Sequence, residues 1–154
     1  MQNHKTTILH MIETTGPGGA ETVVLQLIGR LDPNEFDSTV VLSGRGWLYD
    51  NMMKTGITPE IVPSGGAFDW RFLRQIVRLI RRRKIDLIHS HLPDTGFYAC
   101  LAGMITGVPV LVTIHGMVGA WSDRGFRSRL KMGLIRRRAA RVAAVSDQDR
   151  KSVV

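Results

Sequence analysis

The chain has 154 residues, of which 44% are hydrophobic and 22% are charged, and its formal net charge is +8. This length and composition are typical of one globular domain with a real core. They exclude a membrane-spanning protein, since no apolar run approaches the roughly 20 residues that a span needs. They also exclude an internal disulfide, since Cys100 is the single cysteine, and the first five residues lack the apolar core of a signal peptide.

Apolar runs and amphipathic runs alternate along the sequence, separated by glycine, proline and asparagine. The expected strands are 7–13, 38–42, 58–62, 85–90, 109–114 and 142–145. The expected helices are 19–31, 47–54, 71–84, 94–106 and 126–140, with Ser146 capping a sixth. Short connections between alternating strands and helices indicate a three-layer α/β/α, Rossmann-like domain with a mainly parallel six-stranded sheet. Residues 1–154 are therefore predicted to form a single domain.

A glycine turn, 16–21, lies between the first strand and the first helix. The N-terminus of a helix presents unpaired backbone N–H groups and the positive end of the helix dipole, and glycine lets a phosphate approach them closely. The turn is therefore a candidate phosphate seat formed by the backbone of Gly18 and Gly19. The alternative is a plain turn that uses glycine for backbone freedom.

The turn differs from two known nucleotide-binding motifs. The dinucleotide fingerprint requires a third glycine where Glu21 stands, and an acidic residue at the end of the second strand, where Ser43 stands. Both differences weaken the hypothesis of a nicotinamide-linked oxidoreductase. A P-loop is excluded because no Gly-Lys-Ser/Thr follows.

Histidines mark the ends of two expected strands. His89 and His91 flank Ser90 and lie on one side of the strand by alternation, and His115 ends strand 109–114. A metal site needs a third ligand, and Asp94 is the only neighbour of the right type, so we expect no metal. The alternative for the pair is that one histidine packs near the sheet and the other lines a cleft. His115 can contact a sugar hydroxyl or accept a proton near pH 7, or it can be satisfied by local backbone.

Paired carboxylates and a nucleophile elbow are not evident in the sequence, so a two-carboxylate glycosidase and a serine hydrolase have no support. The positive charge is concentrated in 71–84, which holds seven Lys and Arg, and in 124–141, which holds eight. Neither stretch contains an acid. Such basic helices are either solvated faces or surfaces for an anionic partner. The absence of acids together with Trp70, Phe72 and Leu79 on the flanks of helix 71–84 favours the second possibility, and a basic amphipathic helix can lie on an anionic membrane.

Four short motifs resemble the family 4 glycosyltransferases of the GT-B fold. They are Gly18-Gly19-Ala20-Glu21, Asp86-Leu87-Ile88-His89-Ser90-His91, Thr113-Ile114-His115-Gly116 and Val145-Ser146. Each motif is weak alone, but the four occur in order over nearly the whole chain.

The resemblance implies the acceptor-side domain of a retaining glycosyltransferase of the hexosyltransferase type. Gly18 and Gly19 would meet the diphosphate of a nucleotide-sugar donor, and His115 would contact the transferred sugar as the catalytic residue. His91, Gly116 and Trp121 would line the acceptor side. No metal and no cofactor are expected. The acceptor would be a saccharide or a lipid-linked saccharide, used in polysaccharide or glycolipid synthesis.

The resemblance also implies a second, donor-binding domain that these 154 residues lack, so we expect the chain alone to be inactive. A cytoplasmic location, peripheral at the inner membrane face, fits the basic helices, and an unpartnered cleft face allows a homodimer. The competing hypothesis is a stand-alone, basic, flavodoxin-like binding module for anionic membrane or nucleic acid.

Overall fold

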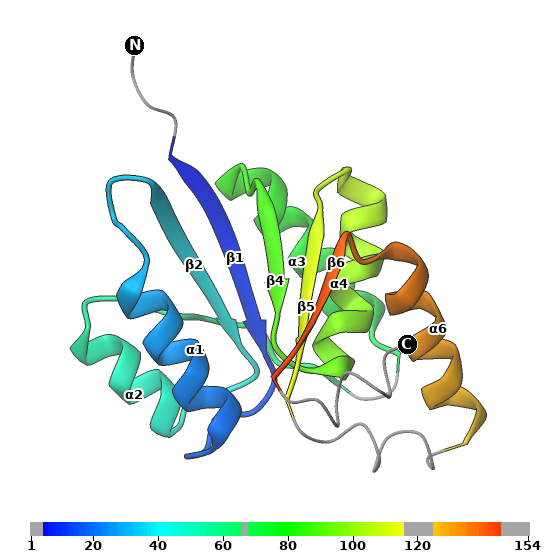
Figure 1. Ribbon diagram of the computed structural model, residues 1–154, viewed down its shortest axis with the longest axis horizontal. Helices are drawn as coiled ribbons and strands as arrows, with labels where there is room; N and C mark the ends of the chain where they lie inside the picture. Colours follow the sequence, from blue (N-terminus) through cyan, green and yellow to red (C-terminus); the bar gives the residue numbers. More distant parts are fainter. Residues whose placement is uncertain (1–4, 66–67, 116–124, 146–154) are drawn as a thin grey trace.

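The computed structural model describes residues 5–65, 68–115 and 125–145. In these ranges six parallel strands form one sheet in the order β3-β2-β1-β4-β5-β6 (Figure 1). The strands are β1 (Thr6–Ile12), β2 (Phe36–Leu42), β3 (Glu60–Ile61), β4 (Leu87–Ser90), β5 (Val110–Ile114) and β6 (Arg141–Ala144). The chain order changes direction between β1 and β4, and ligands of such sheets bind outside the carboxyl ends of the strands near that point.

Helices connect the strands in the expected alternation. They are α1 (Gly19–Arg30), α2 (Trp47–Lys54), α3 (Trp70–Arg83), α4 (Pro93–Thr106) and α6 (Phe126–Arg138). The expected α/β/α architecture is confirmed, and every strand pairing is parallel rather than mainly so. The largest difference is in β3, which has two residues where 58–62 was expected. This edge strand pairs only with the end of β2, so few of its residues can form ladder hydrogen bonds.

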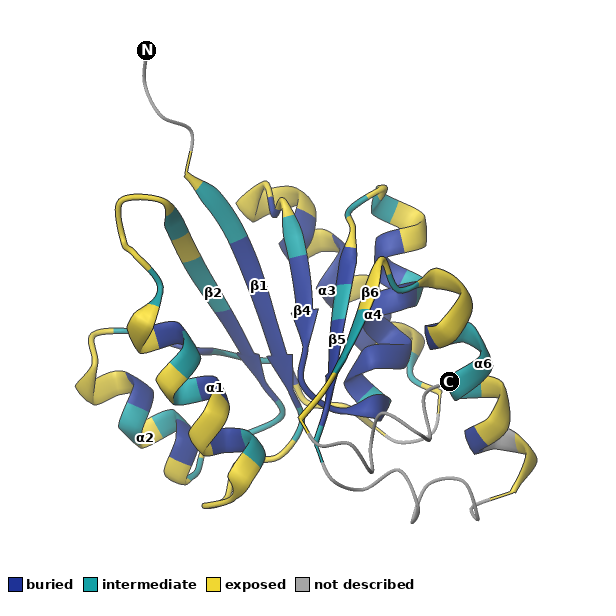
Figure 2. Ribbon diagram, viewed as in Figure 1, coloured by how far each residue is buried: buried dark blue, intermediate teal, exposed yellow. Residues whose placement is uncertain are grey.

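Two apolar clusters cover the two faces of the sheet. Alternate residues of β1 face different clusters, with Leu9 and Met11 on one side and Ile12 on the other. The first cluster includes side chains of α3, α4 and α6, and the second includes those of α1 and α2. Figure 2 shows that β1, β4 and β5 are buried along most of their length, especially toward their carboxyl ends. The site edge is therefore built on the most rigidly packed part of the fold.

Helix α3 has a strong sequence signature, and the structure agrees with it. Asp69 caps the helix by accepting hydrogen bonds from the backbone N–H groups of Arg71 (2.8 Å) and Phe72 (3.0 Å). One face of the helix is an apolar stripe at helical spacing, and it is buried. The stripe consists of Leu73, Ile76, Val77 and Ile80. Burial of this stripe fixes the opposite, arginine-bearing face toward solvent.

Small residues let α4 lie close to β5 and α6, as the sequence suggested. A Cβ at Gly103 would come within 2.8 Å of the carbonyl oxygen of Val108, and one at Gly96 within 3.1 Å of Val112 Cγ1. Cys100 is buried in the same helix, and burial raises the pKa of its thiol to about 11. The thiol is therefore protonated and packs as a small apolar group.

Candidate functional site

A pocket of about 530 Å³ lies at the carboxyl ends of the central strands. Its lining residues are Thr14, Gly19, Ala20, Glu21, Val23, Leu92, His115 and Val145. Two residues singled out from the sequence, Gly19 and His115, thus lie on the same pocket although 96 positions separate them. They meet because β1 and β5 both end at this edge, with β4 between them.

The loop that follows β1 is held by contacts with the turn after β2. Ser43 Oγ donates a hydrogen bond to the carbonyl of Glu13, and the N–H of Leu48 donates to the carbonyl of Thr15 at 3.1 Å. A Cβ at Gly46 would lie 2.8 Å from the same Thr15 carbonyl oxygen. Gly46 therefore allows a close backbone approach that fixes the position of the glycine turn.

Gly18 and Gly19 have different surroundings. Gly18 is the N-cap of α1, and a Cβ there would collide with the carboxylate of Glu21, which is buried at 6% exposure. A Cβ at Gly19 would meet no atom within 4 Å. The backbone at Gly19 is therefore open to a ligand. The Glu21 carboxylate supplies acceptor oxygens that suit sugar hydroxyl groups, but its charge opposes an anion at Gly18.

The expectation that one of His89 and His91 lines a cleft is not met, because His89 is 7% exposed and His91 is fully buried. The ring of His91 lies 6.2 Å from that of His115, measured between centroids. His115 lines the pocket, and His91 forms the layer beneath it. Gly116 and Trp121, the other acceptor-side candidates, and Ser146 lie outside the described residues.

Sequence reasoning missed a third buried histidine, His10 of β1. In the sheet register His10 pairs with His89 of β4, and its Nδ1 lies 3.4 Å from Nε2 of His91. Burial lowers the pKa of His10 to about 3 and that of His89 to about 4, and it lowers the pKa of His91 as well. All three imidazoles are therefore neutral at pH 7.

A pair of carboxylates also gathers at this edge, which corrects the sequence-based statement that none does. Burial and, to a smaller extent, the charge of Asp94 raise the pKa of Glu13 to about 7, against smaller opposing effects of Lys131 and of a hydrogen bond from the Thr95 backbone. Lys131 Nζ donates to Asp94 Oδ1 at 2.5 Å. Glu13 and Asp94 are distant in sequence, so only their positions just after β1 and β4 could have indicated the contact. The arrangement gives Glu13 a proton that it can exchange near neutral pH.

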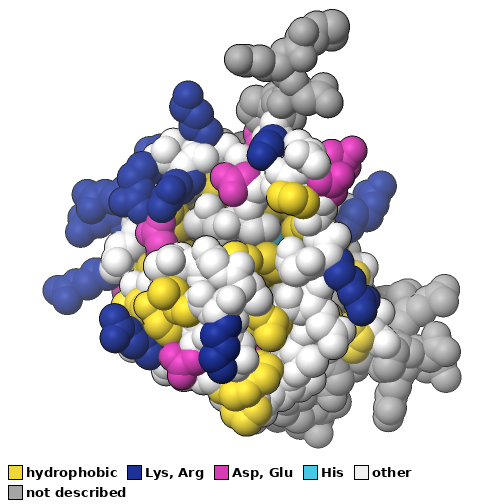
Figure 3. Space-filling view, turned by 90° about the vertical axis from the view of Figure 1, so that its left-hand side faces the viewer, with side chains coloured by type: hydrophobic (Ala, Val, Ile, Leu, Met, Phe, Trp, Pro, Cys, Tyr) yellow, Lys and Arg dark blue, Asp and Glu magenta, His cyan; other side chains and the backbone are white. Residues whose placement is uncertain are grey.

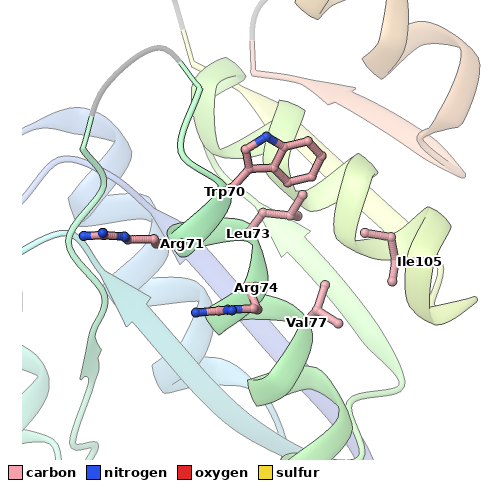
Figure 4. A pocket seen from close by; sticks show the side chains of 6 residues that line it. All are labelled: Trp70, Arg71, Leu73, Arg74, Val77 and Ile105. Atoms are coloured by element: carbon pink, nitrogen blue, oxygen red, sulfur yellow. The ribbon is translucent and has the colours of Figure 1, made fainter.

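A second pocket of about 530 Å³ lies on the outer surface between α3 and α4. Figure 4 shows Trp70, Leu73 and Val77 of α3 on the side that faces Ile105 of α4, whereas Arg71 and Arg74 extend from the other side of α3. Apolar side chains around it are exposed, including Trp70 (66%) and Ile105 (50%). We refer to these six lining residues as the α3–α4 groove.

The arginines of α3 fall into two groups. Arg82 and Arg83 form ion pairs with Glu60 at 2.8 Å and 3.1 Å. Arg71 and Arg74 are exposed and form no ion pair with any described acidic side chain. On the face of the molecule that Figure 3 shows, many of the Lys and Arg side chains gather toward one side. The charge asymmetry expected from the sequence is therefore present on the folded surface.

Among the described helices, none is both long and apolar enough to cross a bilayer.

Comparison with known sequences gives one family and several relatives. Residues 17–154 match the family described as Glycosyltransferase Family 4. The Escherichia coli enzyme UDP-Gal:alpha-D-GlcNAc-diphosphoundecaprenol alpha-1,3-galactosyltransferase is 27% identical over 103 residues, which are 64% of this chain and 27% of the relative. EpsF of Bacillus subtilis (strain 168) is 29% identical over 144 residues, which are 89% of this chain and 37% of that protein.

Solved structures share the fold. The crystal structure of Anabaena Alr3699/HepE in complex with UDP has a TM-score of 0.82 at 18% identity, and the match covers 96% of this chain and 40% of that one. The same protein in complex with UDP and glucose gives a TM-score of 0.80 at 19% identity. The chain thus spans well under half the length of these relatives and structures.

Proposed function

The chain belongs to glycosyltransferase family 4, and from this premise we propose that it is the acceptor-side half of a retaining glycosyltransferase. The donor is a nucleotide-diphosphate sugar, the transferred group is a hexose, and the acceptor is a saccharide or a lipid-linked saccharide. The proteins that support this proposal are a galactosyltransferase whose name includes a UDP-sugar and a diphosphoundecaprenol acceptor, and a structural neighbour crystallised with UDP and glucose.

One observation carries the proposal, namely that Gly19 and His115 line a single pocket at the switch point of the sheet. The exposed backbone at the start of α1 offers N–H groups and a positive helix end to a diphosphate. His115 offers a neutral or protonated imidazole to the sugar or to the leaving group. His91 then serves as a buried support for His115 rather than as a direct acceptor contact.

Membrane association forms the second part of the proposal. The α3–α4 groove combines exposed Trp70 and Ile105 with Arg71 and Arg74 on the neighbouring face of α3. Aromatic and aliphatic side chains beside arginines suit an anionic bilayer surface, where a lipid-linked acceptor would be found. Nucleic acid is a poorer partner for this surface, because the groove is apolar. The protein would then be cytoplasmic and peripheral at the inner face of the membrane.

Gly19→Val tests the diphosphate site in a protein that joins this chain to its donor-binding domain. The Cβ at position 19 meets no atom within 4 Å, so the variant folds, and its side chain fills space that the diphosphate would occupy. We expect the affinity for the UDP-sugar to fall at least tenfold by calorimetric titration, since the ligand loses a close approach to helix N–H groups worth on the order of 1–3 kcal/mol.

Gly29→Val is the matched control, because position 29 lies in the same helix, is equally open, and is not part of the pocket. If donor affinity survives Gly19→Val unchanged, the phosphate seat is wrong. If both variants lose affinity equally, the effect belongs to the helix and not to the pocket.

A further inference from the structure

A cluster of three buried histidines lies beneath the pocket and takes no direct part in the proposed transfer. His10, His89 and His91 each offer one ring nitrogen, and these nitrogens lie within 4.8 Å of one another. The three residues come from β1 and from the end of β4, which are neighbours in the sheet. The third ligand that the sequence lacked near His89 and His91 is thus supplied by a strand 79 positions away in the chain.

The spacing is close to that of zinc ligands. Two imidazole nitrogens on a tetrahedral zinc ion with bonds of about 2.0–2.1 Å lie about 3.4 Å apart. Nδ1 of His10 and Nε2 of His91 are 3.4 Å apart in the structure, where they share a hydrogen bond that a metal ion would replace. The ligand nitrogen of His89 lies within 4.8 Å of the other two, so a shift of roughly 1.4 Å at most brings it to the same spacing.

Hydroxyl groups lie within hydrogen-bond distance of one nitrogen in two of the three rings. Nε2 of His89 lies 2.8 Å from Oγ1 of Thr113, and Nε2 of His10 lies 3.5 Å from Oγ of Ser38. In each of these two rings, Nδ1 is then the nitrogen that would bind a metal ion. Metal-binding histidines commonly hold their second nitrogen in such a hydrogen bond, which fixes the tautomer and the ring orientation.

His91 supplies a second, independent observation. The side chain is fully buried, and its Nδ1 has no hydrogen-bond partner among the described residues. Buried polar atoms are paired in the large majority of cases, so this nitrogen is an exception that needs a partner. Nε2 of His91 faces Nδ1 of His10, so Nε2 is the ring nitrogen at ligand spacing, and Nδ1 is the second ring nitrogen that lacks a partner among the described residues.

From this geometry we propose that His10, His89 and His91 bind one zinc ion. Three histidines are an established zinc ligand set, and the site favours imidazole-preferring metals because no carboxylate belongs to the cluster. The ion would tie β1 to β4 below the pocket and stay separate from sugar transfer, for which no metal is expected.

Zinc titration of the full chain tests the proposal, with the protein prepared without a histidine tag and treated with a chelator. We expect one zinc ion per chain, and a rise in melting temperature of roughly 5–10 °C at a hundredfold excess over the dissociation constant. Cobalt(II) should give the visible absorption of a four-coordinate site. No binding at equimolar micromolar concentrations would overturn the proposal.

Variants distinguish this cluster from surface sites. His10→Gln should weaken zinc binding roughly 100-fold, whereas Glu35→Gln, which changes an exposed side chain outside the cluster, should leave it unchanged. Equal affinity of the wild type and His10→Gln would refute the assignment. If His10→Gln fails to fold, Thr113→Val keeps the test sharp, since loss of its hydrogen bond to His89 should weaken zinc binding about tenfold or more. Unchanged affinity in Thr113→Val would then count against the site.

Discussion

The pocket at the strand ends and the α3–α4 groove have the same volume, about 530 Å³, but they are built differently. The pocket at the strand ends collects the turn before α1, Leu92, His115 and Val145, which only the sheet topology brings together. The α3–α4 groove is formed by two helices that follow one another around β4. The first fixes polar groups in a rigid frame, and the second presents apolar area and charge. We therefore expect chemistry at the first and attachment at the second.

The largest expected effect comes from His115→Ala in a protein that joins this chain to the proposed donor-binding domain. Losing one polar contact to the reacting sugar or leaving group should raise the barrier by about 2–4 kcal/mol, which is roughly 30- to 1,000-fold in turnover. Single-turnover kinetics at saturating donor would measure it. Gln26→Ala, on the exposed side of α1, is the control. If the turnover of His115→Ala equals that of the control, His115 is not a catalytic residue. The assignment of the chemistry to the pocket at the strand ends would then be wrong.

The second effect concerns attachment through the α3–α4 groove. Changing Arg71 and Arg74 together to Gln should weaken binding to anionic vesicles by about 2 kcal/mol, because each arginine near such a surface is worth about 1 kcal/mol. Co-sedimentation at low salt would measure the change. The matched control is Arg82→Gln with Arg83→Gln, which removes the same charge from the same helix but from residues paired with Glu60. Equal losses in the two double variants would indicate diffuse attraction and no specific attachment at the groove.

The sequence predicts the helices, the parallel sheet and the edge at which the first pocket lies, because local patterns of apolar residues determine the secondary structure. The helical spacing around Leu73 and Ile76 predicted α3 and its exposed arginines, and the alternation of elements predicted the parallel sheet. Because the carboxyl ends of parallel strands share one edge, Gly19 and His115 were also expected to meet. The resulting pocket contains both.

The contacts that the sequence did not predict depend on which strands are neighbours. His10 reaches His91, and Glu13 reaches Asp94, because β1 and β4 are adjacent in the sheet. Local periodicity carries no information about that order. The burial of His91 could not be predicted either. The alternation of side chains shows on which side of the strand a residue lies, but it does not show what covers that side.

A smaller effect tests the titratable group near the polar pocket. The folded state raises the pKa of Glu13 from 4.5 to about 7, so it holds the proton more tightly than the unfolded chain. The resulting stability is present below pH 4.5 and is lost as the pH rises toward 7. Glu13→Gln should remove this loss. The full pKa shift corresponds to roughly 3 kcal/mol, and solvent screening of the half-buried side chain reduces the expected gain in stability at pH 8, relative to that at pH 4.5, to about 1–2 kcal/mol.

Urea unfolding of the wild type and Glu13→Gln at pH 4.5 and pH 8 measures this difference. Glu35→Gln, which changes an exposed glutamate, is the control and should not alter the pH dependence. If the free energy of unfolding of Glu13→Gln changes with pH as that of the wild type does, the raised pKa of Glu13 is wrong. Glu13 would then no longer count as a proton carrier near the pocket at the strand ends.

The smallest effect concerns Glu60, whose carboxylate holds Arg82 and Arg83 at the surface. Glu60→Gln should cost only roughly 0.2–1 kcal/mol of stability, because exposed ion pairs are well solvated, and the cost should shrink further at high salt. The same change frees two arginines, so binding to anionic vesicles at low salt should become tighter. If vesicle binding instead weakens, membrane attachment depends on the arrangement of the side chains at the end of α3 and not on the number of unpaired arginines there.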